Sequence, residues 1–78
     1  MTSGEVLDRA RLYVALSRDD LYWRYFALGG SARRSSVEKL LDGHSDEWKP
    51  AEVNILVQAV NERYAEIGMK ALVAYVKH

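Results

Sequence analysis

The 78-residue sequence contains no cysteine, so neither disulfide bonds nor a cysteine zinc site can stabilise the fold. A chain this short buries only about 60–65% of the surface that its unfolded form exposes, so its core has to be efficient. The chain also has no excess of charge of either sign, because 11 Lys and Arg residues balance 11 Asp and Glu residues. Residues 1–41 carry seven basic and five acidic residues, and residues 42–78 carry four and six. This balance argues against the strongly basic surface that is typical of duplex-binding proteins.

Long apolar runs are absent as well. No stretch approaches the roughly 20 apolar residues that are needed to span a bilayer. The first residues include an acid, Glu5, and no long apolar core, so we expect no secretory signal. Hydrophobic residues make up 49% of the chain, as in an ordinary globular domain. We therefore expect a single cytoplasmic domain over residues 1–78, without a membrane partner.

Apolar residues recur at helical spacing along the chain, and no segment alternates with a period of two. Pro50 suits the first turn of a helix, where its missing amide hydrogen costs nothing, and glycines supply helix ends. Cap-like spacings predict three helix starts: Thr2 with Glu5, Ser17 with Asp20, and Ser35 with Glu38. The sequence predicts an all-α fold, a compact bundle of four to five short helices, over about residues 4–17, 19–28, 35–42, 50–67 and, in the less regular tail, 70–76.

Catalytic motifs are not recognisable in this chain. The tripeptide at residues 43–45 resembles the start of a nucleophile elbow, but Glu47 stands where the second glycine belongs. His44, Asp46 and Glu47 are nominal metal ligands, yet one histidine beside two acids in a loop is usually a solvated turn. We therefore expect no enzymatic activity, no metal and no cofactor.

Four of the eight aromatic residues fall within a window of five residues, 22–26. At helical spacing, Tyr25 shares a face with Leu21 and Leu28, whereas Trp23 points elsewhere. One helix facing one small core cannot easily bury four rings, so core packing and a partner surface can coexist here. The candidate interaction surface consists of Tyr22, Trp23, Tyr25, Phe26 and, from a later loop, Trp48.

Two adjacent arginines, Arg33 and Arg34, precede Ser35, the predicted cap of the helix over residues 35–42. Exposed cations at this positive helix end are disfavoured by roughly 0.3–1 kcal/mol each, a cost that a bound anion would offset. Alternatively, the arginines are solvated or pair with the acidic residues Asp42, Asp46 or Glu47. The candidate contacts for an anion or a nucleic acid are Ser31, Arg33, Arg34, Ser35, Ser36 and Lys39.

Three blocks of the sequence, YWRYFALGG (22–30), LLDG (40–43) and AVNERYAEIGM (59–69), are similar to those of a group of small actinobacterial proteins. Together the blocks span most of residues 21–69, while the tail lacks the proline-rich end of that group. The group has no established activity. The resemblance therefore implies only a cytoplasmic, all-helical, regulatory protein.

Two functions remain open from the sequence. The favoured one is a non-enzymatic helical interaction module that self-associates or binds a larger protein through its aromatic residues. The alternative is a small DNA-binding regulator, in which residues 21–42 form a helix-turn-helix-like corner that contacts phosphates through Arg33 and Arg34. The second helix of that corner is short and offers few side chains to base edges, so nucleic acid is the less favoured partner.

Overall fold

The computed structural model describes residues 1–44, 48–70 and 73–75. Within these residues the chain forms four helices and no strand, which confirms the all-α prediction. The helices are α1 (Ser3–Tyr13), α2 (Arg18–Ala27), α3 (Arg34–Leu41) and α4 (Pro50–Glu66). Both α2 and α4 begin and end within one residue of their predicted bounds.

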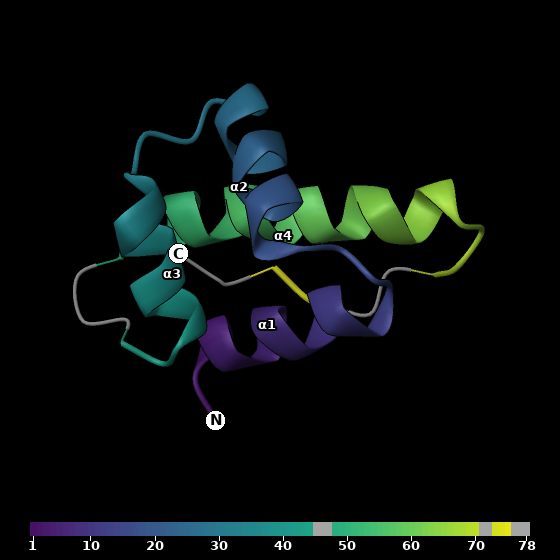
Figure 1. Cartoon of the computed structure of the whole chain (residues 1–78), viewed down its shortest axis with the longest axis horizontal. Coiled ribbons are helices and arrows are strands. Elements are labelled where there is room, and N and C mark those ends of the chain that lie inside the picture. Colours follow the sequence, from purple (N-terminus) through teal and green to yellow (C-terminus); the bar gives the residue numbers. More distant parts are fainter. Residues whose placement is uncertain (45–47, 71–72, 76–78) are drawn as a thin grey trace.

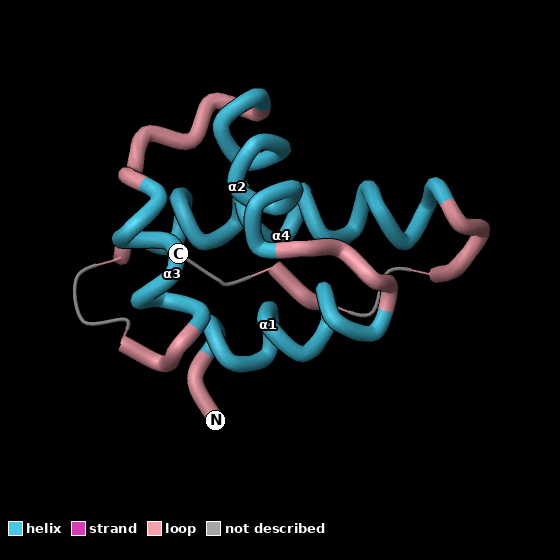
Figure 2. The backbone as a smooth tube through the Cα atoms, in the orientation of Figure 1, coloured by secondary structure: helices cyan, strands magenta, loops and turns pink. Residues whose placement is uncertain are grey.

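The longest helix, α4, lies across the molecule and packs against both α1 and α2 (Figure 1). α1 runs alongside α4, α2 crosses α4 steeply, and α3 lies at the end of the bundle where α1 and α4 begin (Figure 2). None of the described helices is both long and apolar enough to cross a bilayer. The core between the four helices consists of Leu7, Val14, Leu16, Leu21, Tyr25, Val37, Leu40, Leu41, Val53, Leu56, Val57, Ala59, Val60 and Tyr64.

The first helix ends at Tyr13, four residues before its predicted end. Its start is as predicted, because the Thr2 hydroxyl accepts from the Glu5 amide while Glu5 accepts from the Thr2 amide. At the other end Ala15 adopts a left-handed conformation with φ of 55°, and the Leu16 amide donates to the Arg11 carbonyl at 2.9 Å. This turn carries Leu16 into the core, where only 3% of its surface is exposed.

The third helix begins at Arg34 rather than after a Ser35 cap, so the predicted capping box of Ser35 and Glu38 is wrong. Arg33 is the N-cap, and its carbonyl accepts from the amides of both Ser36 and Val37 at 3.0 Å. No side chain caps this helix. The start lies earlier because contacts to α2 and α4 hold residues 31–32 in place and bring the chain into the helix from there.

The second helix ends at the glycine pair, as predicted. Gly29 has φ of 97°, a conformation that glycine adopts without the cost of a side chain. The next glycine serves packing, since a Cβ at Gly30 would lie 2.2 Å from the Tyr25 ring. Both glycines therefore have structural explanations.

The predicted helix over residues 70–76 is wrong for Lys70 and residues 73–75, which are not helical, and its other positions lie outside the described residues. Gly68 ends α4 with φ of 75°. Beyond it, Asn61 of α4 donates from its side-chain amide to the Val73 carbonyl at 3.1 Å. Val73 packs against the core in a non-helical conformation.

Candidate functional site

Three aromatic rings, those of Tyr22, Trp23 and Phe26, contact one another on α2, and we call them the aromatic patch. The Trp23 and Phe26 centroids lie 6.0 Å apart with the ring planes at 78°, and those of Tyr22 and Trp23 lie 5.4 Å apart at 67°. Such edge-to-face pairs suit the charge distribution of aromatic rings. Trp23 and Phe26 are each 57% exposed, so the patch offers a large apolar surface in a fixed arrangement.

Two charged side chains of α2 near Trp23, those of Asp19 and Arg24, are paired within the chain. Arg24 donates two hydrogen bonds to the carboxylate of Glu66, at 2.6 and 2.8 Å, which lowers the pKa of Glu66. One turn before Trp23, Asp19 pairs with Arg34 at 2.5 Å. The two ion pairs tie α2 to α4 and to α3.

Tyr25 is fully buried, so its predicted place on the interaction surface is wrong. It shares the inward face of α2 with Leu21, in agreement with the helical spacing. Its hydroxyl donates to the Glu52 carboxylate at 3.0 Å and accepts from the Ala32 amide at 2.8 Å. Burial is the main cause of the raised pKa of Tyr25. The side chain therefore has a structural role, holding the loop after α2 against α4.

Glu52 is the centre of this network. One of its carboxylate oxygens, Oε1, accepts from the Tyr25 hydroxyl and from both the amide and the hydroxyl of Ser31, at 3.0, 3.0 and 2.6 Å. The hydrogen bonds from Ser31 are the main cause of a lowered pKa for Glu52. The chain thus places its own carboxylate against Ser31, one of the residues predicted to contact an anion.

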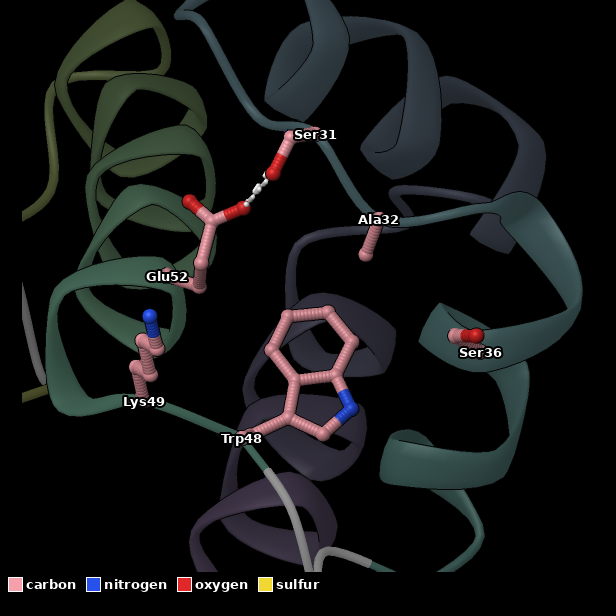
Figure 3. Close-up of a pocket in the computed structure, with 6 residues that line it drawn as sticks. All are labelled: Ser31, Ala32, Ser36, Trp48, Lys49 and Glu52. Atoms are coloured by element: carbon pink, nitrogen blue, oxygen red, sulfur yellow. Dashed lines mark hydrogen bonds between the residues drawn. The ribbon is translucent and has the colours of Figure 1, made fainter.

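A pocket of about 560 Å³ lies beside Glu52, between the first turns of α3 and α4 (Figure 3). Trp48 extends between the two helices, half-buried, with its ring centroid 6.1 Å from that of Tyr25. It therefore lies apart from the aromatic patch with which the sequence grouped it. The residues that line the pocket are Ser31, Ala32, Ser36, Trp48, Lys49 and Glu52.

The residues predicted to contact an anion do not lie together in the structure. Ser31 and Ser36 line the pocket, whereas Arg33, Ser35 and Lys39 are exposed and do not line it. Arg34 pairs with Asp19 across helices. The two arginines therefore do not converge with the serines on one site.

The alternative pairing of the arginines with Asp42 is wrong, because that carboxylate accepts from Arg18 at 2.8 Å. The other two acidic residues of that alternative, Asp46 and Glu47, lie outside the described residues. Arg34 does form an ion pair, but its partner is Asp19 of α2, which the alternative did not name.

Sequence reasoning missed Lys49 and Glu52. A signal for Glu52 does exist: it is the third residue of α4, a position at which an acid usually returns a hydrogen bond to the N-cap residue. Here the N-cap is Lys49, which forms no side-chain cap. An acid without this reciprocal partner is available to another segment, and in this chain the segment is the loop at Ser31.

No group of three or more His, Cys, Asp or Glu side chains that could hold a metal ion occurs in the part of the chain that the structure describes. Comparison of the chain with models of protein families, with curated proteins and with solved structures finds no match.

Proposed function

We propose that this chain is a non-enzymatic, cytoplasmic interaction module with a regulatory role, and that it pairs with a second copy of itself through the aromatic patch. The observation that carries this proposal is the exposure of Trp23 and Phe26, 57% each, on a helix whose inward face is already buried. Aromatic residues in fixed positions are typical anchors of protein interfaces. Covering them removes apolar surface from water, which favours association.

A second copy is the partner that the charges favour. The chain has a net charge of zero, so two copies do not repel one another. The ion pairs Arg24–Glu66 and Asp19–Arg34 already neutralise four of the charges near the patch, so contacts between rings, and not charge pairing, would drive association. In a two-fold arrangement the same patch on each copy faces itself, so rings meet rings.

Light scattering coupled to gel filtration tests this proposal. We expect the mass of the wild-type protein to rise toward that of a dimer with concentration. Trp23→Ser weakens association at least about tenfold, because residues that anchor interfaces contribute that much or more. A matched control is Tyr13→Ser, which removes an aromatic ring that is 70% exposed on α1, outside the patch.

Three results would contradict the proposal. One is a monomeric mass at all concentrations. Another is a dimer that Trp23→Ser leaves intact. The third is a dimer that the Tyr13 variant dissociates equally well, since the interface would then lie elsewhere on the surface.

A further inference from the structure

The pocket beside Trp48 carries one charge of each sign. Lys49, the N-cap of α4, and Glu52, one turn later, both line it, and the ammonium group of Lys49 points toward the side of Glu52 (Figure 3). Within the described part of the chain, neither forms a salt bridge. The two charges therefore do not neutralise each other in an ion pair.

The remaining walls offer an aromatic surface and a hydroxyl. Trp48 packs against the buried Tyr25, which fixes its indole ring, while the part of the ring that stays accessible lines the pocket. The Ala32 methyl lies on one side of the indole, and the Ser36 hydroxyl lies beyond it on α3 (Figure 3). An apolar surface thus stands next to polar groups of both kinds.

These groups restrict the class of ligand. The Glu52 carboxylate would repel a simple anion, and the Lys49 ammonium group would repel a simple cation. A ligand with one charge of each sign has both charges compensated, and its apolar part can cover the indole. The volume of about 560 Å³ lies within the range of about 300–1,000 Å³ that is usual for small-molecule sites.

We propose that this pocket binds a free α-amino acid with an apolar side chain. The ammonium group of the ligand pairs with Glu52, its carboxylate pairs with Lys49, and its side chain packs on Trp48. This site is separate from the aromatic patch and does not depend on self-association.

The carboxylate of Glu52 is fixed before a ligand arrives. Its Oε1 accepts from three donors on Tyr25 and Ser31, and the lowered pKa keeps it ionised at neutral pH. The other oxygen, Oε2, accepts no hydrogen bond within the described residues and is available to an ammonium group. A group that is already held in place loses little conformational freedom when it binds.

Titration with L-phenylalanine, followed by ¹H–¹⁵N NMR, tests the proposal. The chain has two indole Nε1–H signals, and we expect that of Trp48 to shift saturably while that of Trp23 stays in place. Two analogues test the charges: N-acetyl-L-phenylalanine lacks the ammonium group, and L-phenylalaninamide lacks the carboxylate. Each should bind at least about tenfold more weakly, since a hydrogen bond to a charged group is lost.

A pair of variants tests the protein side. Lys49→Met should weaken L-phenylalanine binding about tenfold for the same reason, whereas Lys70→Met, four residues beyond the C-terminal end of α4, should leave it unchanged. Lys49 is exposed and outside the core, so its loss does not endanger the fold. The proposal is overturned if the Trp48 signal does not move with L-phenylalanine, if the three ligands bind equally, or if Lys49→Met binds like the wild type.

Discussion

Glu52 accepts hydrogen bonds from both the amide and the hydroxyl of Ser31, at 3.0 and 2.6 Å, and so joins the first turn of α4 to the loop between α2 and α3. The same oxygen accepts from the hydroxyl of the buried Tyr25. One carboxylate on α4 therefore positions the loop that leads into α3. It also forms one wall of the pocket.

Replacing Glu52 by Gln should lower the free energy of unfolding by about 1–2 kcal/mol, because an ionised acceptor of three hydrogen bonds becomes a neutral one. Urea denaturation followed by circular dichroism measures this change. Glu62→Gln, on the exposed side of the same helix, is the matched control and should shift stability by less than about 0.5 kcal/mol. Equal stability of the two variants would show that the network at Ser31 contributes nothing.

Stability should fall in acid, and Glu52 should be one of the groups responsible. Its pKa in the folded protein is lowered from an ordinary value of 4.5, chiefly by the hydrogen bonds from Ser31. A carboxyl with a lowered folded pKa contributes stability above its unfolded pKa and loses it as the pH falls through the folded pKa. Urea midpoints measured from neutral pH down to below the ordinary pKa should fall less steeply for Glu52→Gln than for the wild type. Parallel pH profiles would contradict this assignment.

Asp8 adds to the same acid dependence. Burial opposes its ionisation, but hydrogen bonds from Arg18 and Arg11 outweigh burial and lower its pKa. Asp8→Asn should therefore also flatten the pH profile, and the double variant with Glu52→Gln should flatten it further. A double variant that retains the full acid dependence would place the responsible groups elsewhere.

Ala15→Gly should stabilise the protein by about 0.5–1 kcal/mol. Ala15 has φ of 55°, where a Cβ costs about 1–2 kcal/mol, and glycine removes this cost. The greater freedom of glycine in the unfolded chain offsets only part of the stabilisation. Thermal denaturation measures the change. Ala27→Gly, at the exposed last residue of α2, is the control and should destabilise the protein, because glycine adds conformational freedom to the unfolded chain. A loss of stability in both variants would mean that the turn at Ala15 carries no strain.

The DNA-binding alternative makes a different prediction for the arginines. The chain carries no net charge and Arg34 pairs with Asp19, so we expect no duplex binding that weakens between about 50 and 200 mM salt. Fluorescence anisotropy with a labelled duplex measures this. Salt-dependent binding that is lost in Arg33→Ala/Arg34→Ala would instead favour the DNA-binding regulator.

Much of the fold follows from local signals in the sequence. Pro50 and the apolar spacing of α4 placed that helix, and the capping box of Thr2 and Glu5 placed the start of α1. The end of α1 could not be predicted, because an alanine at Ala15 takes a conformation that normally signals glycine. Burial of the neighbouring Val14 and Leu16 stabilises this turn, and that burial depends on the whole fold.

The candidate site was less predictable, since it depends on contacts between distant segments. Helical spacing placed Tyr25 beside Leu21 on the inner face of α2, and only Trp23, Phe26 and the half-buried Tyr22 remain in the aromatic patch. The partner of Ser31 is 21 residues away in the sequence. No local pattern links an acid in the first turn of α4 to a loop at that separation.

Dilution of the ¹⁵N-labelled protein, followed through its two indole Nε1–H signals, tests the central claim of self-association most directly. The indole of Trp23 is in the aromatic patch, and that of Trp48 is in the pocket against Tyr25. As the protein is diluted from millimolar to micromolar concentration, the Trp23 signal should shift progressively while the Trp48 signal stays in place. A Trp23 signal that does not change with concentration would contradict self-association through the aromatic patch.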